Sequence, residues 1–107
     1  MPCTNQQSTP QRRSEVKDAI ARLGSALAAG TAQVVIGASG ALAFRGWNNS
    51  EGVSDLCAYR ALAATNSPAL RRAIARAEVV AGRTLDARAL AAGTHSHDGG
   101  TTWSTHT

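Results

Sequence analysis

The chain has 107 residues, which is enough for one domain with a single modest hydrophobic core. Aromatic residues make up only 4% of the sequence, so the core has to be built mainly from Ala, Leu, Val and Ile. Eleven Lys and Arg residues against seven Asp and Glu residues give a formal net charge of +4. This balance favours polyanionic partners, although it is also typical of chains that are generally rich in Ala and Arg.

Membrane insertion and secretion are not expected. No apolar run approaches the roughly 20 residues of a membrane span, and the first residues, MPCTNQQSTPQRRS, contain no hydrophobic segment of a signal peptide. The two cysteines, Cys3 and Cys57, do not form the dense pattern of a disulfide scaffold. We therefore expect a cytoplasmic protein with two free thiols.

The chain opens with a polar arm and a first helix. Residues 1–13 contain Pro2 and Pro10 and lack apolar periodicity, which predicts a disordered arm. Ser14 can cap the helix that follows, and Gly30 can end it. One apolar stripe runs along this helix and consists of Val16, Ile20, Leu23 and Leu27.

A β-hairpin is predicted next. Residues 33–36 are rich in β-branched side chains, and residues 41–45 contain Leu42 and Phe44 at a period of two. The GASG segment between them contains Gly40, which can adopt a positive φ in the turn. We expect Val34, Ile36, Leu42 and Phe44 to share one apolar face of this hairpin, the only sheet. Helices must cover that face, because a lone hairpin is marginally stable in water.

Further helices follow a GWNNSEG loop. Ser54 can cap a second helix, whose apolar side contains Leu56, Tyr59 and Ala63. Ser67 and Pro68 start a third helix that ends at Gly82. Its predicted buried stripe consists of Leu70, Ile74, Ala77 and Ala81. Thr84 and Asp86 open a short fourth helix that ends at Gly93.

The predicted fold class is α+β and mainly helical. It consists of a helix, a two-stranded antiparallel β-hairpin, and then two to three helices. Residues 14–93 form the single domain, and residues 94–107 are expected to be a flexible polar tail because they are rich in Gly, Ser and Thr.

The tail contains the residues with the clearest potential for metal chemistry. His95, His97 and Asp98 are three possible ligands, but a Gly-rich end does not hold ligands in a fixed geometry by itself. We therefore expect no metal and no cofactor. The sequence contains no nucleophile-elbow serine, P-loop or dinucleotide fingerprint, so we expect no enzymatic activity.

Arginines and tryptophans are the candidate contact residues. The arginines follow one another along the third and fourth helices as Arg71, Arg72, Arg76, Arg83 and Arg88. They suit a protein or phosphate partner, and the alternative is the solvated side of amphipathic helices. Trp47 fits either a partner contact or a lid over the core. Trp103, in the tail, is a candidate contact with a protein partner.

The order of the segments IARLGSALAAG, AQVVI, ALAF and VSDLCAYRALAA is helix, strand, strand, helix. Over residues 14–65 this layout resembles the small phage head–tail joining, or head-completion, proteins of the lambda W type. The GWNNSEG loop and residues 67–93 extend beyond the shortest members of that family. The resemblance implies a non-enzymatic virion protein that binds the portal ring in several copies and presents a surface to the next tail component.

Two functional hypotheses follow. The first is a structural interaction protein, phage or prophage encoded, that docks between portal and tail components and is homo-oligomeric in the assembly. It would occur in the host cytoplasm and in the virion. The second is a small basic regulator that binds nucleic acid or inhibits a complex that handles nucleic acid.

Overall fold

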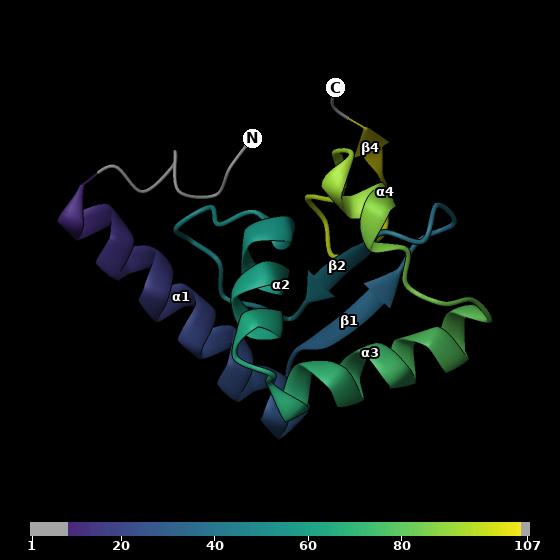
Figure 1. Cartoon of the computed structure of the whole chain (residues 1–107), viewed down its shortest axis with the longest axis horizontal. Helices are drawn as coiled ribbons and strands as arrows, with labels where there is room; N and C mark the ends of the chain where they lie inside the picture. The colour runs from purple at the N-terminus through teal and green to yellow at the C-terminus, as the bar shows by residue number, and fades with distance from the viewer. Residues whose placement is uncertain (1–8, 106–107) are drawn as a thin grey trace.

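The computed structural model describes residues 9–105, which form four helices and two small antiparallel sheets (Figure 1). The helices are α1 (Pro10–Ala29), α2 (Asp55–Ala64), α3 (Pro68–Ala81) and α4 (Ala87–Ala91). The strands are β1 (Gln33–Ile36), β2 (Leu42–Arg45), β3 (Thr94–His95) and β4 (Ser104–Thr105). The predicted α+β, mainly helical class is confirmed. None of the helices in this part of the chain is long and apolar enough to cross a membrane.

Helix α1 begins earlier than predicted. Thr9, rather than Ser14, is its N-cap, because the Thr9 hydroxyl accepts the Arg12 N–H at 3.0 Å and Pro10 occupies the first helical position. Residues 9–13 are therefore not part of a disordered arm, and residues 1–8 of that predicted arm lie outside the described residues. Gly30 ends the helix as predicted, with a φ of 81°.

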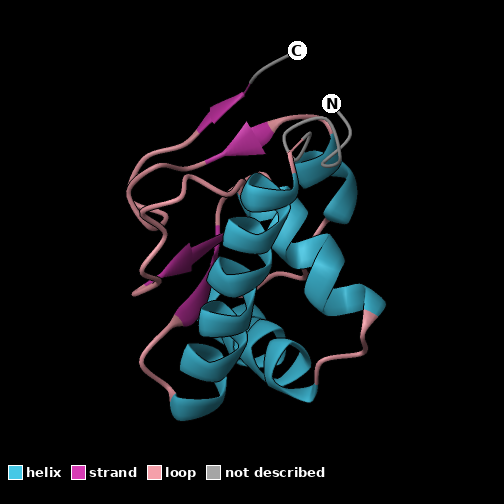
Figure 2. Ribbon diagram, turned by 90° about the vertical axis from the view of Figure 1, so that its left-hand side faces the viewer, coloured by secondary structure: helices cyan, strands magenta, loops and turns pink. Residues whose placement is uncertain are grey.

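The hairpin has the predicted buried face. Val34 lies opposite Phe44 and Ile36 opposite Leu42, and all four side chains are buried. Gly40 adopts a φ of 91° in the connecting turn. Figure 2 shows the strands on one side of the molecule and the long helices on the other. The helices therefore supply the cover that an isolated hairpin lacks.

The buried sides of α2 and α3 differ in part from the predicted stripes. The side chains that these two helices bury are Cys57, Ala58, Leu62, Leu70, Ala73 and Ala77. Leu56 and Tyr59 are only half-buried, and Ala63 and Ala81 are exposed. Several of these buried residues are alanines. Their small side chains allow α2 and α3 to approach neighbouring elements more closely than bulkier side chains would.

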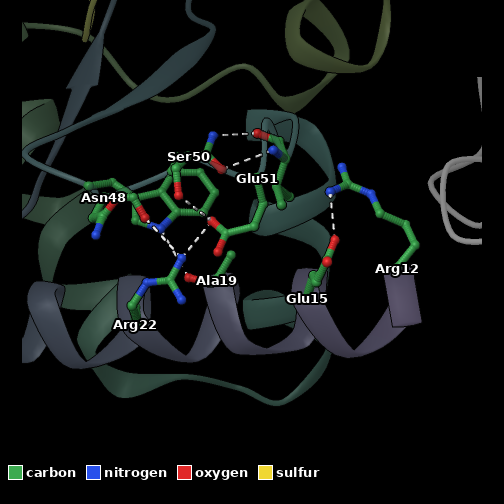
Figure 3. Close-up of polar contacts among 10 residues, drawn as sticks. Arg12, Glu15, Ala19, Arg22, Asn48, Ser50 and Glu51 are labelled. Carbon is green, nitrogen blue, oxygen red and sulfur yellow. Dashed lines mark hydrogen bonds and ion pairs between the residues drawn. The ribbon is translucent and has the colours of Figure 1, made fainter. Parts of the chain in front are cut away.

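The loop between β2 and α2 is fastened to α1 by an arginine (Figure 3). Arg22 Nη2 lies 2.6 Å from Glu51 Oε1 and donates a hydrogen bond of 3.2 Å to the Asn48 carbonyl oxygen. The hydrogen bond from Arg22 holds the pKa of Glu51 below its usual value. A loop rich in Asn, Ser and Gly is thereby held in place beside the first helix.

The prediction of a single sheet is wrong, because β3 and β4 form a second antiparallel pair. Thr94 lies opposite Thr105, and His95 lies opposite Ser104. The segment between these two strands folds back over the outer face of the first hairpin. Its Gly100 packs closely against the Val35 side chain.

Residues 94–105 are thus part of the fold, in contrast to the predicted flexible tail. Trp103 packs against Gly37 at the end of β1, and the Gly99 carbonyl oxygen accepts the Arg45 Nε–H at 3.2 Å. Residues 106 and 107 of the predicted tail lie outside the described residues. The glycines make this docking possible, since a Cβ at position 37 would lie only 2.6 Å from the indole.

The state of one cysteine also differs from the prediction. Cys57, buried on α2, is disulfide-bonded and is therefore not a free thiol. The other cysteine of the chain, Cys3, lies outside the described residues. A stable disulfide is typical of an oxidising environment.

Candidate functional site

Four exposed arginines lie on helix α3 or directly after it. Three are on the helix, and the fourth follows the glycine that ends it. They are Arg71, Arg72, Arg76 and Arg83. Within residues 9–105, none of the four has a carboxylate at ion-pair distance. Arg88, on α4, is exposed as well, but its Nε lies 3.5 Å from Asp86 Oδ1. Four exposed arginines without an ion pair in the described chain therefore lie on and just beyond α3.

Two exposed valines accompany these arginines. Val79 and Val80 are 82% and 85% exposed, respectively, and are the large hydrophobic side chains most open to water in the described chain. The sequence analysis did not single them out. A signal was present, because consecutive helical residues are about 100° apart and two adjacent valines cannot both lie on one buried stripe. Apolar side chains surrounded by unpaired charge are typical of a contact surface.

A groove of about 360 Å³ runs between β1 and α3, and we call it the edge groove. It is lined by all four residues of β1, by Arg45, and by Ala73, Arg76, Ala77, Val80 and Ala81 of α3. The lining thus includes two arginines and no acidic residue. The edge groove joins an apolar floor to positive charge, and Val80 connects it to the exposed valine pair.

A second hollow, of about 720 Å³, lies between the β2–α2 loop and residues 95–99. Asp55 at the start of α2 and the imidazoles of His95 and His97 line it. Burial raises the pKa of Asp55 to about 7, and positive charge at His95 opposes part of that rise. The His95 and His97 rings meet edge to face, with their centroids 4.6 Å apart.

The candidate metal ligands do not form a metal centre. Asp98 accepts hydrogen bonds from the Thr102 hydroxyl at 2.6 Å and from the Ser96 hydroxyl at 2.8 Å. These bonds, that of Thr102 foremost, lower the pKa of Asp98 to about 2. In the part of the chain that the structure describes, no three His, Cys, Asp or Glu groups are placed to hold a metal ion. Although His95, His97 and Asp98 line one hollow, the geometry does not bring them together as ligands.

Both tryptophans are used in packing. The Trp47 indole N–H donates to the Ala19 carbonyl oxygen at 3.0 Å, and its ring stands edge-on to Phe44 at 5.9 Å. Of the two roles that the sequence allowed for Trp47, the structure shows the lid over the core. The Trp103 indole N–H donates to the Gly100 carbonyl oxygen at 3.1 Å, which turns the ring toward the protein. Neither tryptophan lines the edge groove.

No family model, curated protein or solved structure matches the chain. The site is therefore argued from its own geometry. The edge groove and the exposed face of α3 combine unpaired arginines, exposed valines and a hollow. This combination is typical of a surface that binds a partner.

Proposed function

We propose that the chain is a non-enzymatic structural protein that docks between larger components of an assembly, as the phage head–tail joining proteins that it resembles do. In this proposal one component is the portal ring and the other is the next part of the tail. The protein would bind the ring in several copies. The observation that carries the proposal is the pair of exposed valines on α3 beside four arginines that have no carboxylate partner within residues 9–105.

The energetics of this surface favour a protein partner. Burying an exposed valine side chain contributes about 1.5–3 kcal/mol, and α3 offers two of them side by side. The arginines around them gain carboxylate partners only when an acidic surface arrives. A partner that is apolar at its centre and acidic around it therefore matches α3, and it needs no catalytic group.

The disulfide at Cys57 supports the virion as the place where the protein works. Disulfides persist in oxidising surroundings such as those of a released particle, and they are rare in proteins that stay in the cytosol. We propose that the chain is made in the host cytoplasm and acts in the finished particle.

The direct test is binding of the full chain to the portal ring of the phage or prophage that encodes it, followed by mass photometry. We expect a saturable complex with several copies per ring. Val80→Asp and Arg76→Glu should weaken it at least tenfold, because each places unfavourable charge at the contact. Arg60→Glu is the matched control, since Arg60 is exposed on α2 and does not line the edge groove. The proposal is wrong if the ring is not bound, or if all three variants bind alike.

The alternative function is a small basic regulator that binds nucleic acid, and the unpaired arginines favour it to some extent. Such a protein loses affinity steeply as salt rises, because phosphate contacts release counterions. The docking protein has no useful affinity for a 20-base-pair duplex at any salt concentration. A fluorescence-anisotropy titration with that duplex at several salt concentrations separates the two functions.

A further inference from the structure

We propose that the edge groove binds an extended acidic segment of the partner, which adds to the sheet as a third strand beside β1. This inference rests on the proposed docking function and names the kind of partner segment that the site accepts. Three properties of the described residues support it. They are the unpaired edge of β1, the apolar floor that α3 provides beside that edge, and the positive charge of the arginines that line the groove.

The edge of β1 carries peptide groups without partners. The Gly37 N–H donates to the Ala41 carbonyl oxygen at 2.9 Å, so this pair is hydrogen-bonded across the hairpin. Bonded and non-bonded pairs alternate in an antiparallel ladder, so Val35 is bonded to β2 whereas Val34 and Ile36 are not. The N–H and C=O groups of Val34 and Ile36 therefore point away from β2. Within residues 9–105 no strand or side chain pairs with them.

Such an edge is a template for another strand. Natural proteins commonly protect a sheet edge with lysine, proline, a bulge or a covering element. Strand β1, with the sequence QVVI, contains no charge and no proline. The main-chain groups of Val34 and Ile36 can form hydrogen bonds with an extended peptide, as in other cases of strand addition.

Helix α3 provides the floor on which an added strand would rest. Ala73, Ala77 and Val80 recur at four- and three-residue spacing, so they lie on one side of the helix. All three line the edge groove. Val80 is 85% exposed and gains most from being covered. Side chains alternate along a strand, so every second residue of the added segment would face this floor and should be apolar.

The positive charge of the groove favours acidic side chains at those positions of the added strand that do not face α3. The lining of the groove contains Arg45 from β2 and Arg76 from α3, and it contains no acidic residue. Neither arginine forms an ion pair within residues 9–105. Carboxylates on the residues that do not face α3 would complement these charges. The favoured occupant is thus a strand in which apolar and acidic residues alternate.

The test uses the ¹⁵N-labelled full chain and the peptide Glu-Val-Glu-Val-Glu-Val-Glu with blocked ends. We expect saturable binding, with hydrogen exchange of the Val34 and Ile36 amides slowed at least about tenfold. The Val35 amide is already bonded to β2 and should change much less. Replacing every Glu in the peptide by Lys should weaken binding at least tenfold, and Arg76→Glu in the protein should reverse that preference. Arg60→Glu should leave both affinities unchanged.

Two N-methylated peptides make the test specific for strand addition. In an extended strand the N–H groups of the valines point to one edge and those of the glutamates to the other. Methylating the valine nitrogens in one peptide and the glutamate nitrogens in the other should abolish binding of one peptide only. If both still bind, or if the parent peptide does not bind, strand addition is wrong. If the Val34 and Ile36 amides become protected only as protein concentration rises, a second copy occupies the edge and the acidic partner strand is wrong.

The outcomes for strand addition and for docking are independent. If the portal ring binds but the peptide does not, the docking function stands and the strand inference fails. If the peptide binds in the expected manner but the portal ring does not, the edge groove is a strand-binding site and the partner is a different protein.

Discussion

The docking of residues 99–103 on the first hairpin can be tested by adding a single methyl group at position 37. A Cβ built on Gly37 lies 2.6, 2.9 and 3.0 Å from three atoms of the Trp103 indole. Carbon atoms are normally about 3.5–4.0 Å apart at contact, so the indole must move by about 1 Å to make room. The backbone itself tolerates the change, because Gly37 does not have a positive φ. Gly37→Ala is therefore a steric test of the contact with Trp103.

We expect Gly37→Ala to lower the free energy of unfolding by about 1–3 kcal/mol, the usual cost of overpacking a tight contact. This cost has a ceiling, because the segment around Trp103 detaches once the strain exceeds its docking free energy. In a Trp103→Ala background the methyl group enters empty space. There the same change should be neutral, or stabilising by about 0.4–1 kcal/mol through the lower entropy of the unfolded chain. The double-mutant cycle should thus show a coupling of about 1–4 kcal/mol.

Urea unfolding followed by circular dichroism measures the cycle, and the indole N–H resonance of Trp103 reports the local contact. Gly24→Ala is the matched control. A Cβ there meets Leu62 at an ordinary 3.6 Å in the interior of α1, so we expect a gain of about 0.5–1 kcal/mol in both backgrounds. Equal costs of Gly37→Ala with and without Trp103 would refute the packed position of residues 99–103.

Three further changes test other parts of the structure. Phe44→Ala should lower the free energy of unfolding by about 3 kcal/mol or more, because a buried ring is replaced by a cavity; an unchanged melting curve would place Phe44 outside the core. Burial raises the pKa of Asp55 from 3.8 to about 7, so between these pH values the folded state keeps a proton that the unfolded chain has lost, and stability falls as pH rises. Asp55→Asn should remove this pH-dependent loss of stability, which is at most about 4 kcal/mol for a partly buried group. Thermal melts at several pH values measure the effect, with Asp18→Asn as the control. A wild-type dependence of stability on pH in the Asp55 variant would contradict the prediction. Cys57→Ser should cost about 2–4 kcal/mol and make the melting temperature insensitive to reductant, whereas a full response of that variant to reductant would show that another group is responsible.

The fold of the first hairpin and of α3 could be predicted from local signals. The alternation of Val34 and Ile36 predicted the buried face, and Gly40 marked the turn. Ser67 followed by Pro68 marked the start of α3, and Gly82 marked its end. In each case the residues that indicate the strand, turn or helix end lie within a few positions of it. A short stretch of the sequence is therefore enough to predict each of these elements.

The position of residues 94–105 could not be predicted in this way. A segment rich in Gly, Ser and Thr has the composition of a flexible tail. Its docking depends on glycines that leave room for a neighbour distant in sequence, as Gly37 does for Trp103 and Gly100 for Val35. No window of the chain contains both members of such a pair. The edge groove was missed for the same reason, since β1 and α3 are separated by more than thirty residues.

The docked segment also affects how β1 could bind a partner. Gly100 packs on the Val35 side chain, and the Gly99 carbonyl oxygen accepts a hydrogen bond from Arg45. These two glycines therefore stabilise the outer face of the hairpin. Neither of them lines the edge groove beside α3. A strand edge that is already fixed in shape loses less conformational entropy when a peptide adds to it. Gly37→Ala, which displaces the same segment, should therefore weaken binding of the Glu-Val peptide even though residue 37 lies outside the groove. An unchanged affinity in a variant whose Trp103 indole resonance has moved would show that β1 holds its shape without the tail.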